Sequence, residues 1–392
     1  MIEDKKNIKI VRIFSRLNIG GPSLQVVLLS EDLSPKYETI LVTGGVGREE
    51  GDMSYLLQNS KKCRHIFIPE LGRNIHFWKD FVAFYKIVKL LIYEKPNVIH
   101  THTAKAGVLG RLAAIVARVP VRIHTFHGHV FDGYFHPIKT RIVIWIEKML
   151  AYFTTTIIAI SPRQKDDLVN KYKITSDNKV SVIPLGLDLK PFRVPTKDTL
   201  RVKQQFQLPL DKYLVGIVGR LVPIKNHIFF LNISNKIIHM RQDVHFIIVG
   251  EGQYYELIRN EIQNMGISNY FSLLGWQKEL KPIYDILDVV CLTSLNEGTP
   301  VSLIEAQACE KAIVATDVGG VRDIVFPGKN GYVVPLGNEN DFVKKIITLI
   351  DDVETRQKMG KYGKEFVFES FGKEKLLENI DKLYSKFLMV NN

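Results

Sequence analysis

The feature that most constrains the fold is a repeated alternation of short apolar runs with longer amphipathic stretches. In the first half of the chain, we expect strands at 8–14, 39–42, 65–68, 97–100, 121–125, 156–160 and 180–183. The stretches expected to be helices are 75–93, 104–118, 137–153 and 162–171. Short strands that alternate with helices are typical of βαβ units in a mostly parallel sheet. The first half therefore predicts an α/β sandwich.

The alternation lapses around residues 188–208, where Pro191, Pro195 and several charges indicate a linker with some helical character. It then resumes, with expected strands at 213–218, 245–249, 270–274, 289–292, 313–315 and 331–334. The expected helices are 226–240, 254–265, 300–309 and 339–349, followed by a charged helical segment, 355–388. We therefore expect two α/β sandwiches of similar size with a cleft between them.

The composition narrows the class of protein. A chain of 392 residues favours two domains or more, and 46% hydrophobic residues permit a sizeable core. The net charge of +12 could attract nucleic acid, anionic lipid or an anionic substrate. We find no zinc-finger spacing and no RNP-like run, so no nucleic-acid partner is expected.

Three scattered cysteines, Cys63, Cys291 and Cys309, favour a reducing compartment over a disulfide framework or a zinc site. The sequence shows no signal peptide, and no uninterrupted apolar run reaches membrane-spanning length. We therefore expect a soluble cytoplasmic protein, one that can still touch a membrane surface.

The segment 296–306, Asn-Glu-Gly-Thr-Pro-Val-Ser-Leu-Ile-Glu-Ala, lies between two expected strands. Thr299 can cap a helix and Pro300 suits its first turn, which would place Glu297 in the preceding loop and Glu305 inside the helix. The first amides of a helix can bind an anion, and the two carboxylates can accept hydrogen bonds from sugar hydroxyls. Two glutamates at this separation are no rarer than chance, so their context carries the prediction of a nucleotide-sugar site.

Further candidates follow other strands of the second half. Gly219, Arg220 and Lys225 lie on a loop after the strand 213–218, and both cations can lie near a diphosphate. An ordinary solvated loop is the alternative for these residues. Glu251, between two glycines, indicates either a tight turn or a close ligand approach, and Trp276 could abut a nucleobase or pack half-buried.

Two segments of the first half are also candidates. Gly20 and Gly21 follow the first strand, and their loop enters a helix whose amides could face phosphate. It lacks the fingerprint Gly-x-Gly-x-x-Gly, which disfavours a dinucleotide-binding dehydrogenase. It also lacks a following Lys-Ser/Thr pair, which disfavours a P-loop. Of the histidines at the ends of neighbouring strands, we place His127 at the cleft because Gly128 permits an exposed turn. His100, His124 and His129 are interpreted as packed or surface side chains.

The sequence contains no Asp-x-Asp pair, which enzymes often use to hold a sugar diphosphate through a divalent metal. No histidine has an acidic or cysteine partner at a familiar zinc spacing. We therefore expect no metal cofactor, with Arg220, Lys225 and helix amides contacting the phosphates instead.

Together, these motifs resemble retaining glycosyltransferases of family 4, which have the two-domain GT-B fold. The resemblance covers nearly the whole chain. Its specific motifs are Gly20-Gly21, His100-Thr-His-Thr-Ala-Lys-Ala-Gly107 with Gly110-Arg111, His127-Gly128, Ile160-Ser-Pro162, Ile183-Pro-Leu-Gly-Leu-Asp188, Gly219-Arg220 with Lys225, and Glu297 to Glu305. The resemblance implies two Rossmann-like domains with parallel sheets facing an interdomain cleft. We expect them at 1–190, on the acceptor side, and 191–392, on the nucleotide-sugar side, with the last helix, about 373–392, packing back on the first domain.

The resemblance also implies roles for the candidate residues. Arg220 and Lys225 would neutralise the leaving diphosphate of a donor that is most often UDP-linked, Glu305 would bind the ribose, and Glu297 would contact hydroxyls of the donor sugar. The remaining implied donor contacts are amides of Gly298 and Thr299 near the sugar, amides of Val301, Ser302 and Leu303 at a phosphate, the Gly20-Gly21 loop, and His127 at the reacting centre. Transfer of a hexosyl or N-acetylhexosaminyl group would retain the anomeric configuration through positioning and stabilisation of leaving-group charge.

Within the family, the Lys-Ala-Gly sequence after the paired histidines is similar to enzymes of bacterial surface-polysaccharide assembly. This implies a growing or lipid-linked glycan acceptor at the inner face of the plasma membrane. Residues 77–81 and 139–153 mix basic and large apolar side chains, as a membrane-surface helix does, although ordinary helices covering a sheet are an equal alternative. Two other functions stay open: a UDP-sugar epimerase of the same fold, and a non-catalytic nucleotide-sugar-binding subunit.

Overall fold

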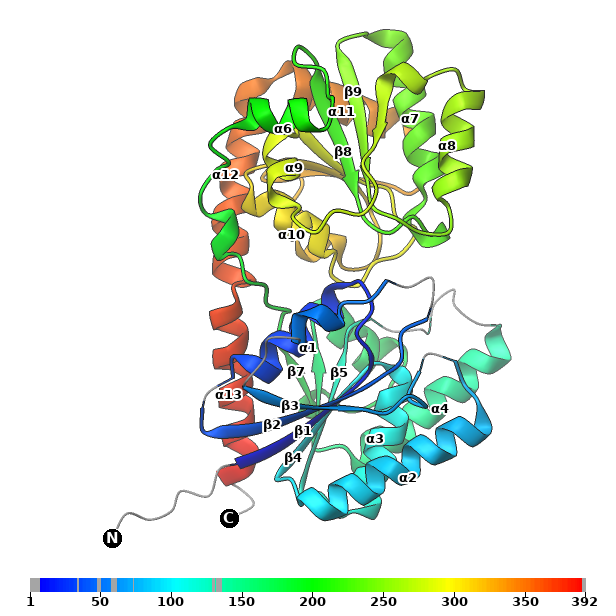
Figure 1. The fold of residues 1–392 in the computed structure, drawn as a ribbon, viewed down its shortest axis with the longest axis vertical. Coiled ribbons are helices and arrows are strands. Elements are labelled where there is room, and N and C mark those ends of the chain that lie inside the picture. Colours follow the sequence, from blue (N-terminus) through cyan, green and yellow to red (C-terminus); the bar gives the residue numbers. More distant parts are fainter. Residues whose placement is uncertain are drawn as a thin grey trace. The chain divides into compact units, whose positions relative to one another are not determined.

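The structure is a computed structural model that describes residues 8–33, 35–47, 51–57, 62–72, 74–128, 131 and 136–389. The chain forms two compact units (Figure 1). Unit 1 comprises Met1–Leu187 together with Lys373–Asn392, and unit 2 comprises Asp188–Gly372. Each unit is an α/β domain built on one parallel sheet, as the alternation of strands and helices predicts.

Unit 1 contains a seven-stranded sheet in the order β3-β2-β1-β4-β5-β6-β7. Its strands are β1 (Ile8–Arg16), β2 (Tyr37–Gly44), β3 (Cys63–Phe67), β4 (Val98–His102), β5 (Val121–Phe126), β6 (Thr156–Ala159) and β7 (Val180–Val182). The order reverses between β1 and β4. Open α/β sheets bind ligands beyond the carboxyl ends of two such strands, so this switch point is where a site of unit 1 is expected.

Helices cover both faces of the unit 1 sheet (Figure 1). They are α1 (Gly21–Glu31), α2 (Phe77–Glu94), α3 (Ala104–Val116), α4 (Pro137–Phe153), α5 (Pro162–Asp166) with a π-helical turn (Asp167–Lys171), and α13 (Lys373–Met389). Side chains of β1 alternate between the faces: Val11 packs with Ile87 of α2, whereas Ile10 packs with Ile380 of α13. Helix α13 thus completes the core of unit 1, although all of unit 2 lies between it and β7 in the sequence.

Unit 2 contains a six-stranded sheet in the order β10-β9-β8-β11-β12-β13, which reverses between β8 and β11. Its strands are β8 (Tyr213–Val218), β9 (Val244–Val249), β10 (Phe271–Leu273), β11 (Val289–Leu292), β12 (Ala312–Thr316) and β13 (Gly331–Val334). Its helices are α6 (Thr199–Gln205), α7 (His227–Met240), α8 (Tyr255–Asn264), α9 (Lys281–Ile286), α10 (Val301–Ala308), α11 (Glu339–Asp351) and α12 (Val353–Ser370).

One local prediction differs from the structure, and one short helix was not predicted. The segment 162–171, expected as one helix, is the short α5 followed by a π-helical turn. The segment 355–388, expected to be helical, consists of α12 and α13, and α13 corresponds to the separate last helix that the sequence predicts. Helix α9 was not expected, because its six residues are too few for a periodic pattern to stand out.

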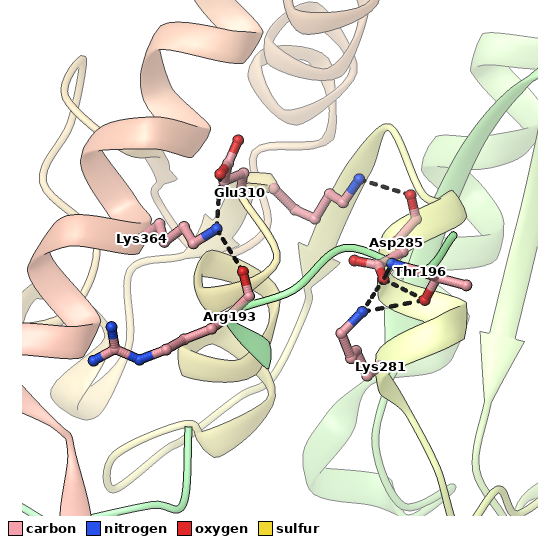
Figure 2. A network of polar contacts seen from close by, with 7 residues as sticks. Arg193, Thr196, Lys281, Asp285, Glu310 and Lys364 are labelled. Atoms are coloured by element: carbon pink, nitrogen blue, oxygen red, sulfur yellow. Dashed lines mark hydrogen bonds and ion pairs between the residues drawn. The ribbon is translucent and has the colours of Figure 1, made fainter. Parts of the chain in front are cut away.

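The segment that enters unit 2 is tied down by polar contacts (Figure 2). The backbone N–H and hydroxyl of Thr196 donate to Oδ2 of Asp285 at 2.8 and 2.5 Å, and Lys281 forms an ion pair with the same carboxylate. Lys364 Nζ donates to Glu310 Oε1 at 2.9 Å. Burial acts to raise the pKa of Asp285, but the hydrogen bonds from Lys281 and Thr196 hold it below its ordinary value. The start of unit 2 is therefore fastened to α9.

Candidate active site

The candidate residues of unit 2 meet at its switch point, where β8 and β11 pair in parallel. Lys225, on the loop after β8, donates from Nζ to Oε1 of Glu297, on the loop after β11, at 2.6 Å. Ser294 Oγ donates to the same oxygen at 2.5 Å. The side chains of Lys225 and Glu297 are only 19% and 11% exposed. The structure thus forms a largely buried ion pair from two residues that the sequence places 72 positions apart.

The loop after β8 is held firmly on the sheet edge. Thr293 Oγ1 donates to the carbonyl oxygens of Lys225 and Asn226 at 3.0 and 3.1 Å. The guanidinium of Arg220 makes no hydrogen bond or ion pair with any residue that the structure describes. A fixed loop therefore presents one cation engaged with a carboxylate and a second cation able to accept an anion.

A glycine pair that the sequence analysis missed supports the Glu297 loop. The N–H of Gly320 donates to the carbonyl oxygens of Glu297 and Gly298 at 3.2 and 3.1 Å. Gly319 has φ +48°, and a Cβ there would lie 1.8 Å from the carbonyl oxygen of Glu297. Two adjacent glycines shortly after the expected strand 313–315 were the available signal, since such a pair allows close approach of a backbone.

The start of α10 corrects one prediction. The helix begins at Val301 with Pro300 as its N-cap residue, and the hydroxyl of Thr299 is buried without a partner among the described residues. Pro300 is extended, with ψ 102°, so it cannot be the first helical residue, and Thr299 lies one position too early to cap the helix. The amide of Leu303 donates to the carbonyl oxygen of Pro300 at 3.1 Å, which leaves Val301 and Ser302 as the amides available to an anion.

Glu305 lies in the second turn of α10, in surroundings unlike those of Glu297. Its Oε2 accepts a hydrogen bond from the hydroxyl of Tyr284 at 3.1 Å. Burial raises the pKa of Glu305 to about 7, while the hydrogen bond from Tyr284 acts in the opposite direction. Glu305 is therefore poised between its neutral and ionised forms at neutral pH, and it has no cation beside it in the described structure.

Three further candidates lie on neighbouring loops of the same sheet edge. Gly219 and Glu251 follow the adjacent strands β8 and β9, and the carbonyl of Glu251 accepts from the N–H of Leu221 at 2.9 Å. The N–H of Gly250 donates to Gly275 at 2.8 Å, next to Trp276, which is 41% exposed. The structure thus gathers the candidate residues of unit 2 along the carboxyl ends of β8, β9, β10 and β11. A separate groove between α7 and α11, lined in part by Lys236 and Ile347, contains none of them.

In unit 1, the glycine loop and His127 follow strands close to the switch point. Gly20 is the N-cap of α1 and Gly21 its first residue, after β1, and no side chain caps the helix. His127 follows β5, next to β4, and its Nε2 lies 2.9 Å from Nδ1 of His102. The two rings stack with centroids 5.1 Å apart. Burial lowers the pKa of His127 to about 4, so its ring is neutral at neutral pH.

The surroundings of His102 determine which ring nitrogen of His127 carries the proton. Nε2 of His102 is buried and has no hydrogen-bond partner in the part of the chain that the structure describes. A buried N–H without an acceptor is less tolerable than a bare lone pair, so we assign the proton of His102 to Nδ1. His102 then donates to Nε2 of His127, and the neutral His127 carries its own proton on Nδ1. His127 therefore offers an N–H donor from the nitrogen that His102 does not hold.

The other histidines pack inside unit 1, as the sequence predicts. His100 lies 2.6 Å from the hydroxyl of Tyr384 and 2.7 Å from that of Thr125, and His124 lies 2.9 Å from the hydroxyl of Thr101. His129 lies outside the described residues. Among the described residues, no three His, Cys, Asp or Glu side chains come together in a way that could hold a metal ion.

Two parallel-sheet domains with polar loops at their switch points define the GT-B class of glycosyltransferases. HepE from Anabaena, solved in complex with UDP, is 20% identical with a TM-score of 0.81, over 97% of this chain and 100% of that one. Sucrose-phosphate synthase from Thermosynechococcus elongatus is 22% identical with a TM-score of 0.83, over 98% of this chain and 100% of that one. These similarities show that the fold is GT-B.

The sequence comparisons place the chain within that class. Residues 19–191 match the family described as Glycosyltransferase Family 4, and residues 198–366 match Glycosyl transferases group 1. The Escherichia coli UDP-Gal:alpha-D-GlcNAc-diphosphoundecaprenol alpha-1,3-galactosyltransferase is 30% identical over 341 residues, which cover 86% of this chain and 87% of that protein. The capsular polysaccharide biosynthesis glycosyltransferase CapM of Staphylococcus aureus is 27% identical over 347 residues, covering 86% and 88%. The chain belongs to glycosyltransferase family 4.

Proposed function

We propose that the protein is a retaining glycosyltransferase that moves a hexosyl or N-acetylhexosaminyl group from a UDP-linked donor to a lipid-linked or growing glycan in surface-polysaccharide synthesis. The observation that carries the proposal is the Lys225–Glu297 ion pair at the switch point of unit 2, with the unengaged guanidinium of Arg220 on the same loop as Lys225. Such a place suits a ligand that combines a diphosphate with sugar hydroxyls.

In this proposal, different residues of unit 2 contact different parts of the donor. Arg220, Lys225 and the amides of Val301 and Ser302 neutralise the departing diphosphate, as fixed charges and dipoles do best when they are oriented before the reaction. Glu305 accepts hydrogen bonds from the ribose hydroxyls. Glu297, held through one oxygen by Lys225 and Ser294, contacts the donor sugar with its other oxygen, near the amides of Gly298 and Thr299.

The proposed role of His127 follows from its protonation. A neutral ring with its proton on Nδ1 can donate to an oxygen of the donor sugar but cannot supply a positive charge, because burial keeps its pKa near about 4. Gly20 and Gly21 are proposed to offer backbone amides to the same donor, and Glu251 and Trp276 to border it. Retention would result if the acceptor hydroxyl attacks the face that the diphosphate leaves, with catalysis by positioning and charge stabilisation. We propose that no metal is required, since two cationic side chains and helix amides at this sheet edge could contact the phosphates.

The names of the relatives support the acceptor class. The Escherichia coli relative is named for a diphosphoundecaprenol-linked acceptor and a UDP-linked donor, and the Staphylococcus aureus relative for capsular polysaccharide. HepE was solved with UDP and with UDP-glucose. By this reasoning the protein would work in the cytoplasm, at the inner face of the plasma membrane.

The proposal is tested with purified protein and a panel of UDP-sugars. UDP or the correct UDP-sugar should raise the melting temperature, because a ligand at 100 times its Kd stabilises a protein by about 2.7 kcal/mol. With a lipid-linked acceptor, UDP release should fall about 10- to 100-fold in Glu305→Ala, since a hydrogen bond to a charged group contributes about 1.5–3 kcal/mol.

Glu256→Ala is the matched control, because Glu256 is exposed on α8 and, among the described residues, pairs only with Arg259 on the same helix. It should release UDP at the wild-type rate. A folded and fully active Glu305→Ala would overturn the assigned role, and tight UDP binding without turnover for any acceptor would favour a non-catalytic subunit.

A further inference from the structure

Helix α4 is apolar on two sides, which an ordinary surface helix is not. Its inner side, including Leu150 and Ala151, is buried in the core of unit 1. Its outer side carries a continuous row at helical spacing whose members are 48% to 78% exposed: Ile138, Ile142, Trp145, Met149 and Tyr152. The core accounts for the inner row, whereas the outer row remains largely exposed, with contacts of Tyr152 to Phe153 and Lys179 at one end.

Helix α2 repeats this arrangement. Ala83, Ile87 and Leu91 face the core and are fully or almost fully buried. The opposite side of the helix presents large apolar side chains that are 54% to 69% exposed: Trp78, Phe81, Tyr85 and Ile92. An apolar row on the solvent side of two helices cannot be explained by packing within unit 1.

The two rows lie on the same side of unit 1. Helix α3 packs against both α2 and α4, and all three helices cover the same face of the unit 1 sheet (Figure 1). Between the rows, α3 adds Leu112 and Val116, which are 41% and 58% exposed. We call these outward side chains of α2, α3 and α4 the outer face. Monomeric soluble proteins rarely expose so many large apolar residues together, and such patches mark interaction sites.

The exposed charge on these helices is positive. They contain eight Lys or Arg residues against three Asp or Glu residues. Each acid is engaged with a base: Asp80 with Lys105, Glu94 with Lys9 and Arg64, and Glu147 with Arg111. The exposed charges of the helices, including Lys79, Lys89, Arg141 and Lys148, are therefore all positive.

We propose that the outer face docks on the surface of an anionic lipid bilayer. Trp and Tyr prefer the boundary between headgroups and acyl chains, and Lys and Arg can extend past them to the phosphates. A second copy of this face would bring positive charges together, which is unfavourable, whereas anionic headgroups are complementary. None of the candidate site residues takes part. The inference deepens the proposed function, on which its biological sense rests, by naming the surface through which the enzyme would reach a lipid-linked acceptor.

The test measures binding of the full-length protein to sedimented vesicles. The vesicles contain either phosphatidylcholine alone or equal parts of phosphatidylglycerol and phosphatidylcholine. Trp78→Asn with Trp145→Asn should weaken binding to the mixed vesicles at least about tenfold, since each buried aromatic side chain contributes a large apolar area. Lys89→Gln with Arg141→Gln should weaken it about fivefold per residue at low salt and should leave the weak binding to phosphatidylcholine unchanged.

The controls change equally exposed residues of unit 2. Met240→Gln with Leu210→Gln matches the apolar pair, with exposures of 67% and 53%, and Lys344→Gln with Lys361→Gln matches the charged pair. Both control proteins should bind as the wild type does. If the double tryptophan variant does not fold, Tyr85→Ser with Tyr152→Ser examines the same two rows.

Wild-type protein that stays in the supernatant with mixed vesicles would overturn the proposal, as would equal binding by the tryptophan variant and the wild type. Dimers that the tryptophan substitutions abolish, without vesicle binding, would assign the outer face to self-association instead. Melting curves with UDP on the same samples separate the two proposals. Stabilisation by UDP without vesicle binding would reject the bilayer alone, and vesicle binding without UDP stabilisation would reject only the proposed function.

Discussion

His127 owes its hydrogen-bonding character to one neighbouring side chain. His102 is fully buried, and its Nδ1 lies 2.9 Å from Nε2 of His127. If His102 donates, as its unpartnered Nε2 indicates, it fixes the tautomer of His127 without touching a substrate. His102 is then a positioning residue, and its contribution depends on a donor at the place of Nδ1 rather than on an imidazole ring.

This argument predicts different outcomes for two amide substitutions at position 102. The amide nitrogen of asparagine can take the place of Nδ1, whereas that of glutamine falls nearer to Nε2. His102→Asn should therefore keep kcat/KM for UDP release within about threefold of the wild type, while His102→Gln and His102→Ala should lose at least about tenfold, as expected when one hydrogen bond is lost. Steady-state kinetics with the identified donor and acceptor would measure these values.

Melting temperatures separate positioning from packing. All three variants disturb a buried site and should lose about 1–3 kcal/mol of stability, so activity that follows the donor rather than stability supports the assignment. His245→Asn is a matched control, because His245 is buried in unit 2 and lies 2.9 Å from the hydroxyl of Ser272. Equal losses in His102→Asn and His102→Gln would show that His102 acts only as a core residue.

Among the structural elements, the loop that carries Glu297 depends on a turn from elsewhere in unit 2. The 3-10 turn Gly319–Asp323 follows β12 and places Gly319 and Gly320 against the backbone of Glu297 and Gly298. The position of the Glu297 carboxylate is therefore set by contacts between two neighbouring sheet-edge loops. A side chain on either glycine would move the loop that faces the donor.

Gly319→Ala should cost several kcal/mol and remove donor binding. The new Cβ would meet the carbonyl oxygen of Glu297 at 1.8 Å, and φ +48° is strained for any residue with a Cβ. Gly337→Ala provides the control, since Gly337 has φ +82° but nothing within 4 Å of the added Cβ. Gly337→Ala should lower the free energy of unfolding only by the cost of a left-handed backbone, about 1–2 kcal/mol, and should bind UDP normally. Urea unfolding and UDP titration measure both effects, and normal UDP affinity in a folded Gly319→Ala would contradict the proposed support.

The sequence predicted the elements better than the contacts between them. Nearly every expected strand is present within two or three residues, because apolar runs bounded by polar loops reflect local burial. The meeting of Lys225 with Glu297 was also predictable, since loops after parallel strands emerge at one edge of a sheet. The support from Gly319 and the contact of His102 with His127 were not, because they depend on which strands are neighbours. Thr299 failed as a cap because the backbone of Pro300 sets where α10 begins.

At the scale of the whole molecule, both units bury neutral histidines. Burial lowers the pKa of His127, His227 and His245 to about 4 and lowers those of His100, His102 and His124 well below the ordinary value. Between pH 6.5 and about 4, the unfolded chain binds protons at these positions and the folded chain does not. The stability they support is therefore fully present above pH 6.5 and is lost as the pH falls.

The free energy of unfolding should decrease on acidification from pH 6.5 to pH 5, by up to about 1.4 kcal/mol per pH unit for each histidine. Glu305, with its pKa raised to about 7, acts in the opposite direction but is a single group. Urea unfolding at several pH values measures how steeply the free energy of unfolding depends on pH. His227→Asn, whose side chain cannot titrate, should lower this slope by the contribution of one histidine. A stability that stays constant over this interval would show that the histidines are accessible to protons in the folded state.

The placement of α13 sets an order for folding during synthesis on the ribosome. The side chains that close one face of unit 1, including Leu376, Ile380 and Tyr384, are translated only after every residue of unit 2. When unit 2 has just been synthesised, Ile10 and Ile123 of unit 1 are therefore still uncovered. Unit 2, which is continuous in sequence, is by then complete. The domain that begins first on the ribosome is consequently the one that is completed last, and chaperones would find its open face throughout translation of the other.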